Sequence, residues 1–139
     1  MFPLAMSDWP SDPSRPLHET TTDGLMLKEA ELVNLFIKLR NFIFSLHPDS
    51  HELVYNTHAL TSVFSHSTKL KHAYCHIPVY TAHLNLGFNK GSLLHDSENR
   101  LQGTGKLIRH IPVKSTSDFN NDYVIKLLKE AIAQAQPDQ

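Results

Sequence analysis

The most informative part of the sequence is a pair of stretches, residues 73–80 (AYCHIPVY) and 83–88 (HLNLGF). Apolar and polar residues alternate along both, which is typical of β-strands. A short turn at residues 81–82 brings the two apolar sides onto one face without a shift of register. The facing pairs are Val79 with Leu84, Ile77 with Leu86, and Cys75 with Phe88. The sequence therefore predicts an antiparallel β-hairpin that is buried on one side. Pro78 lacks a backbone donor, which indicates an edge strand or an outward-facing residue.

Three further stretches have the alternation and the β-branched and aromatic residues that are typical of strands. They are residues 52–58, 60–66 and 106–113. Glycine, serine and asparagine make the segment 89–105 a loop. Together with the hairpin, these stretches predict an antiparallel sheet of about five strands.

A helix is predicted on each side of this β-rich region. The first covers residues 25–46, is capped by Asp23 and ends before Pro48. Its apolar residues recur at helical spacing: Leu32, Phe36, Leu39, Ile43 and Leu46. The second covers about residues 119–135 and is capped by Asp118. This order predicts a two-layer α+β domain, in which both helices cover one face of the sheet and the other face is more polar.

Length and composition limit the function. The 139 residues suit a single globular domain, with 40% hydrophobic and 19% charged residues. Residues 1–24 hold four of the eight prolines and are predicted to be a disordered extension of one domain over residues 25–136. The net charge of −1 argues against nucleic-acid binding, and no apolar run is long enough to cross a membrane. The single cysteine suits a reducing compartment, so we expect a cytoplasmic protein.

The segment LQGTGKLIRHI (residues 101–111) is the strongest candidate for a binding site. Gly103 and Gly105 let a ligand approach the backbone closely, while Lys106 and Arg109 supply positive charge. The alternative is a tight connection beside a solvated lysine. The candidate site for a small anionic ligand consists of Asn85, Gly103, Gly105, Lys106, Arg109 and His110.

Arg109 is the residue on which this interpretation depends. Alternation along the last strand places its side chain with the apolar residues, and a buried guanidinium needs a negatively charged partner. That partner is either an anionic ligand or a carboxylate of the chain, for which Glu52 is a candidate. A bulge that turns Arg109 outward is the third alternative.

Ten histidines are the unusual feature of the composition. His76, His83 and His110 are expected on the more polar face of the sheet, where neutral imidazoles suit a divalent metal. Solvent-facing histidines are the alternative, because no HxH or HExxH motif is present. Cys75 faces the predicted core, and the sequence has no nucleophile elbow and no readable carboxylate pair. We therefore expect a protein that is not an enzyme.

Residues 83–88 and 101–111, followed by a capped helix that ends in small residues, resemble the YdhG-like group of uncharacterised domains. Residues 54–56 and 63–65 fit the same pattern, so the resemblance covers about residues 28–135. It implies a small cytosolic α+β domain, and one branch of the group is linked to frataxin-like handling of iron. The first helix has no acidic ridge of the kind used for that purpose, so no residue is assigned to iron.

Three functions are therefore expected. The first is a non-catalytic module that binds a small anionic ligand at residues 101–111 and the adjoining sheet face. The second is a metal-binding protein of the frataxin-like iron-chaperone type, which uses His76, His83 and His110. The third is a protein-interaction adaptor that forms a homodimer through the first helix. The wide apolar surface of that helix leaves open whether it packs within the chain or against a second copy.

Overall fold

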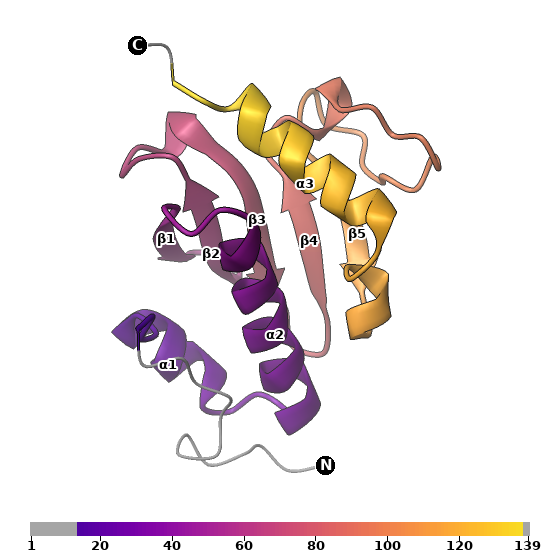
Figure 1. Ribbon diagram of the computed structural model, residues 1–139. Coiled ribbons are helices and arrows are strands. Elements are labelled where there is room, and N and C mark those ends of the chain that lie inside the picture. The colour runs from indigo at the N-terminus through magenta and orange to yellow at the C-terminus, as the bar shows by residue number, and fades with distance from the viewer. Residues whose placement is uncertain (1–13, 138–139) are drawn as a thin grey trace.

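The structure is a computed structural model that describes residues 14–137 (Figure 1). Its helices and strands follow the order α1 (Glu19–Leu25), α2 (Ala30–Leu46), β1 (His51–Asn56), β2 (Leu60–Ser65), β3 (Ala73–Val79), β4 (Leu84–Phe88), β5 (Arg109–Val113) and α3 (Asp122–Gln134). Short 3-10 helices lie at Leu70–His72, Gly91–Leu93 and Thr116–Asp118.

The five strands form one antiparallel sheet in the order β1-β2-β3-β4-β5, so each strand pairs with its neighbours in the sequence. The predicted hairpin register is confirmed, since Cys75 faces Phe88 and Val79 faces Leu84. β3 is the central strand, so Pro78 is not at an edge. The pairing of β3 with β4 is interrupted around Pro78, because proline has no N–H to donate.

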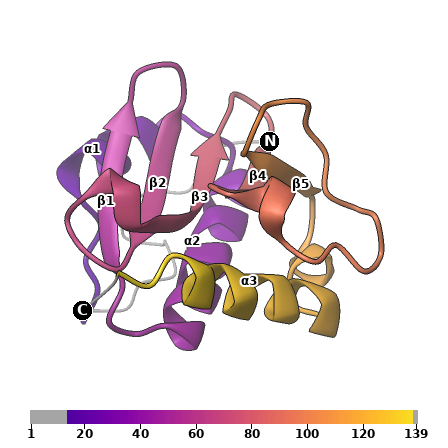
Figure 2. The same ribbon diagram turned by 90° about the horizontal axis from the view of Figure 1, so that it is seen from above.

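α2 and α3 lie side by side on one face of the sheet (Figures 1 and 2), as the sequence predicts. Alternation along the strands turns one set of side chains toward these helices. The buried core residues include Phe36 and Ile43 of α2, Phe64, Ile77 and Leu86 of the sheet, and Val124 and Leu128 of α3. The two-layer α+β architecture follows from this single buried layer.

The N-terminal boundary of the domain differs from the prediction. Residues 19–24, expected in the disordered extension, form most of α1, and Leu25 at its end is fully buried. Residues 26–29 are not helical and separate α1 from α2. Asp23 therefore lies inside α1 and does not cap α2. Residues 1–13 lie outside the described residues, so the expectation for them stays a prediction.

Arg40 of α2 is buried, whereas the sequence indicated a buried guanidinium only at Arg109. Its Nε and Nη2 donate to the Glu52 carboxylate of β1 over 2.9–3.1 Å. Its Nη1 donates to the carbonyl oxygen of Arg15 at 3.0 Å, and Nη2 donates to that of Pro16 at 3.3 Å. One guanidinium therefore joins α2, β1 and the segment that precedes α1.

The apolar surface of α2 is covered within the chain. Phe42 packs against Phe119 with ring centroids 5.1 Å apart, and the Arg15 guanidinium lies 4.0 Å above the ring centroid of Phe44. The sheet covers the opposite side of the helix. The wide apolar surface, which motivated the expected homodimer, is thus explained by packing inside the fold.

Candidate functional site

The face of the sheet opposite α2 and α3 carries more apolar surface than the sequence indicates. Two cross-strand rows cross it: Tyr55, Thr61 and Pro78 in one, and Leu53, Val63, His76, Gly87 and His110 in the other. Tyr55 is 42% exposed and Tyr80, just after β3, is 38% exposed. Contiguous exposed apolar surface of this kind is a candidate for a binding surface.

A hollow of about 340 Å³ lies on this face. Strands β1, β2 and β3 form its floor, with contributions from residues 57–59, Leu70, Asn89 and Ile108. Its twelve lining residues include no Asp, Glu, Lys or Arg. The volume falls near the lower end of the range for small-molecule sites, roughly 300–1,000 Å³.

His76 is the most constrained polar side chain of the hollow. Its Nδ1 lies 2.9 Å from Oδ1 of Asn89, and because that oxygen only accepts, Nδ1 carries the proton and Nε2 is an acceptor in the neutral ring. Burial lowers the pKa of His76; the Asn89 bond opposes this shift and nearby His110 adds to it. A Cβ at Gly87 would lie 2.2 Å from Nε2, so this glycine makes room for the imidazole.

The predicted anion site is only partly brought together. Asn85 and His110 lie on the open face, opposite Pro112 and Gly87 respectively. Gly103, Gly105 and Lys106 lie in the loop before β5, and Arg109 is the first residue of that strand. None of the six predicted residues lines the hollow. Whether they bind an anion stays a prediction.

Arg109 is half-buried and lies opposite Phe88 in the β4–β5 pairing, so its side chain leaves the strand on the same side as Ile111 and Val113, as alternation predicts. Its Nη1 donates to the carbonyl oxygens of Gly105 at 2.6 Å and Ile108 at 2.7 Å, so the guanidinium closes its own loop. Glu52, suggested as its partner, is bonded to Arg40 instead. The β4–β5 pairing runs to Arg109 without a bulge, so the outward-turning bulge is not found, and among the described residues no carboxylate pairs with Arg109. An anionic ligand for it stays a prediction.

The last strand is shorter than predicted and begins only at Arg109. Residues 106–108 leave the sheet, since Ser92 captures their carbonyl oxygens: its backbone nitrogen donates to Leu107 and its Oγ to Lys106, both at 2.9 Å. Gln102 instead pairs with His110 on the side of β5 away from β4, through two bonds of 2.8 and 2.9 Å. The alternating pattern of residues 106–113 therefore predicts a strand that is three residues too long at its start.

The three predicted metal-binding histidines are not assembled. His76 and His110 share one row on either side of Gly87, but His83 lies in the β3–β4 turn. The His83 ring stacks on Tyr80, with centroids 4.6 Å apart. Among residues 14–137, no three His, Cys, Asp or Glu side chains are placed to hold a metal ion together.

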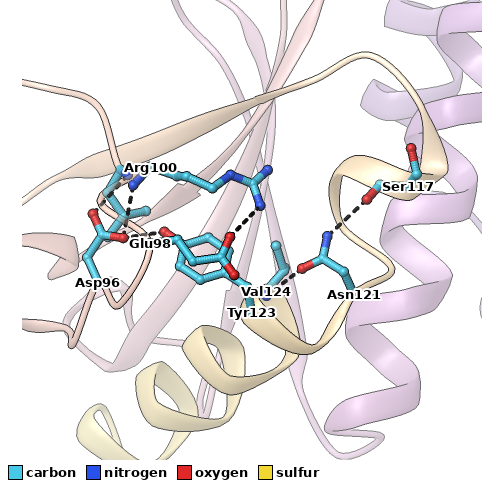
Figure 3. Close-up of polar contacts among 8 residues, drawn as sticks. Asp96, Glu98, Arg100, Ser117, Asn121, Tyr123 and Val124 are labelled. Atoms are coloured by element: carbon cyan, nitrogen blue, oxygen red, sulfur yellow. Dashed lines mark hydrogen bonds and ion pairs between the residues drawn. The ribbon is translucent and has the colours of Figure 1, made fainter.

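A polar cluster that the sequence analysis missed anchors the loop 89–108 to α3 (Figure 3). The Asp96 carboxylate accepts the Tyr123 hydroxyl and the backbone N–H groups of Arg100 and Leu101. Although desolvation acts in the opposite direction, these hydrogen bonds lower the pKa of Asp96. The Arg100 guanidinium lies 4.9 Å from the Tyr123 ring centroid. Every group is used internally, so the cluster is structural.

Figure 3 also shows the start of α3. Asn121, and not Asp118 as predicted, caps this helix, because its Oδ1 accepts from the backbone nitrogen of Val124 at 2.9 Å. Asp118 instead accepts from the backbone nitrogens of Lys114 and Ser115 and closes the preceding 3-10 turn. Asp118 and Asn121 lie three positions apart, but Asp118 caps the 3-10 turn and Asn121 caps α3.

Comparisons of the chain with protein-family models, with curated proteins and with solved structures give no match. The resemblance to YdhG-like domains therefore stays an expectation from the sequence. Among the described residues, no helix is long and apolar enough to cross a membrane. Any function must be inferred from the chain's own residues, and the hollow on the open face is the feature best suited to a ligand.

Proposed function

We propose that this chain is a non-catalytic binding module, and that its ligand is a small uncharged molecule with a flat ring, held in the hollow of the open sheet face. The observation that carries the proposal is the lining of that hollow, which combines two exposed tyrosines with a floor free of formal charge. A charged ligand would lose its hydration there without gaining a counter-ion.

The hollow offers both affinity and orientation to such a ligand. Tyr55 and Tyr80 present aromatic surface, and an offset or edge-on ring contact contributes about 0.5–1.5 kcal/mol beyond the burial of area. Thr61, His76 and Asn89 supply a small number of polar groups among apolar neighbours. This combination is typical of sites for small organic molecules.

The proposal changes the ligand class that the sequence favours. Lys106 and Arg109 are the bases on which the anion site depends, and they lie outside the hollow. Arg109 is already bonded to backbone carbonyl groups. The metal-binding and homodimer alternatives gain no support from the described residues, because His83 stands apart and α2 is covered.

Binding is tested by two-dimensional ¹⁵N NMR of the full chain, with indole, phenol and inorganic phosphate as separate probes. The ring compounds are expected to shift the backbone amides of Thr61, Val63 and His76. Phosphate is expected to leave these amides unchanged. Shifts confined to Gly103 and Lys106 on addition of phosphate would restore the anion site, and the absence of shifts with every probe would contradict a binding module of either kind.

Two variants locate the site. Tyr80→Ala is expected to weaken ring binding by roughly tenfold, which corresponds to about 1.4 kcal/mol. Thr61→Phe places a ring in the hollow from β2 and is expected to abolish binding without unfolding the chain, because Thr61 lies on the open face. Leu93→Ala is the control, since Leu93 is exposed but outside the hollow. Equal binding by all three variants would refute the placement.

A further inference from the structure

Two histidines on the helix-covered side of the molecule face each other through their ring nitrogens. His47 follows α2 and His66 follows β2, and Nε2 of His47 lies 3.1 Å from Nδ1 of His66. The second nitrogen of His66, Nε2, lies 2.6 Å from the carbonyl oxygen of Ile132 in α3. A carbonyl oxygen only accepts, so His66 carries its proton on Nε2 and turns a lone pair on Nδ1 toward His47.

The surroundings hold both rings while leaving them accessible. Tyr74 packs against His47 and His66, with ring centroids 5.9 and 5.6 Å apart, and its hydroxyl is bonded to Ser50 at 2.6 Å. Both imidazoles are only half-buried. An ion from solvent can therefore reach the gap between the two nitrogens, with water completing its coordination.

We propose that His47 Nε2 and His66 Nδ1 bind one divalent transition-metal ion. Two nitrogens on a tetrahedral Zn²⁺ at about 2.0–2.1 Å each lie about 3.3 Å apart, close to the spacing of this pair. Metal-bound histidines usually donate their other N–H to a carboxylate or a backbone carbonyl, which is the arrangement of His66 with Ile132. Imidazole suits Zn²⁺, Cu²⁺ and Ni²⁺.

The metal competes with an ordinary hydrogen bond between the two rings. Without metal, His47 donates its Nε2 proton to His66; with metal, neutral His47 carries its proton on Nδ1 and both facing nitrogens are ligands. An ion in this position ties the end of α2 to the end of β2. The pair shares no residue with the expected site of His76, His83 and His110, or with the hollow.

The test is calorimetric titration of the full, tag-free chain with Zn²⁺ and with Cu²⁺ after removal of metal by chelation. One ion per chain is expected, with Cu²⁺ bound more tightly than Zn²⁺. His47→Gln and His66→Gln each remove one of the two ligands, so each is expected to weaken binding by at least the roughly 10–100-fold that is typical when a ligand loses its hydrogen-bond partner. His83→Gln is the control, because His83 is exposed and lies in the β3–β4 turn, apart from the pair.

Thermal unfolding gives a second readout, because a metal that binds only the folded chain raises the melting temperature. Zn²⁺ is expected to raise it for the parent and not for His47→Gln. Absence of stoichiometric uptake, or uptake unchanged in both pair variants, would overturn the proposal and leave the hydrogen bond alone. Loss of binding only in His83→Gln would also overturn it. If His66→Gln fails to fold, His47→Gln decides by the same criteria.

Discussion

The buried ion pair between Arg40 and Glu52 is the interaction whose loss we expect to cost most stability. The two side chains are 4% and 10% exposed, and the guanidinium makes three contacts with the carboxylate oxygens. Removing one partner leaves a buried charge without compensation, which typically costs about 3–5 kcal/mol. Since a domain of this kind is stable by about 5–15 kcal/mol, a single substitution brings it close to unfolding.

The two single variants are not expected to be equal. Glu52→Gln keeps one oxygen acceptor for Arg40, so we place its cost near the lower end, about 3 kcal/mol. Arg40→Met strands the carboxylate and also removes the bonds to the carbonyl oxygens of Arg15 and Pro16, so about 4–5 kcal/mol is expected. The combination of Arg40→Met with Glu52→Leu removes both charges and should cost less than either single change.

Urea unfolding followed by circular dichroism measures these free energies, provided that the slope m is unchanged. Hydrogen exchange over residues 14–18 gives a second comparison. Arg40→Met removes the two bonds to the carbonyl oxygens of Arg15 and Pro16 and should speed exchange there, whereas Glu52→Gln leaves both bonds in place. The pair of Glu98 and Arg100, 54% and 38% exposed and 3.5 Å apart, is the matched control. Single costs below about 1 kcal/mol that add in the double variant would refute the reasoning from burial.

Three further predictions concern single side chains. Gly87→Ala forces the His76 ring aside and is expected to lower stability by about 1–3 kcal/mol, whereas Gly105→Ala, with no atom within 4 Å of its added Cβ, should not; similar unfolding midpoints would contradict this. Burial lowers the pKa of His76, so the unfolded chain takes up the proton first and stability falls as the pH drops below 6.5; a parent and His76→Gln with the same pH dependence would exclude this cause. Tyr123→Phe removes a donor to Asp96 and should cost about 1–3 kcal/mol and speed hydrogen exchange in residues 100–101, and unchanged exchange would contradict the anchoring role.

Local patterns predicted the parts of the fold that depend on neighbours in the sequence. The β3–β4 register follows from alternation over residues 73–88, because a slip of one residue would turn every apolar side chain outward. The end of α2 at Leu46 follows from Pro48 in the same way. Such features need no knowledge of distant segments.

Distant partners explain the failures. Arg40 lies between apolar residues of α2, which is a signal of burial, but the sequence does not show that its partner is Glu52, the carboxylate suggested for Arg109. The residue that truncates β5, Ser92, lies fourteen positions before Lys106. Residues 19–24 were predicted in the extension because residues 1–24 are rich in proline and polar residues, whereas in the structure α1 contacts β1 and β2 and Leu25 at its end is fully buried. Sequence spacing contains none of this information.

The position of the candidate site follows from the difference between two parts of the open face. Val63 lines the floor of the hollow and is only 5% exposed, while Tyr55 and Tyr80 at its rim are open to solvent. A ring placed against these tyrosines is shielded from water on more than one side, and the burial of its apolar surface favours binding. An anion beside Lys106 would stay in solvent and gain little from an exposed charge. This difference is why we propose the hollow and not the basic loop as the binding site, although the basic loop is the more conspicuous feature of the sequence.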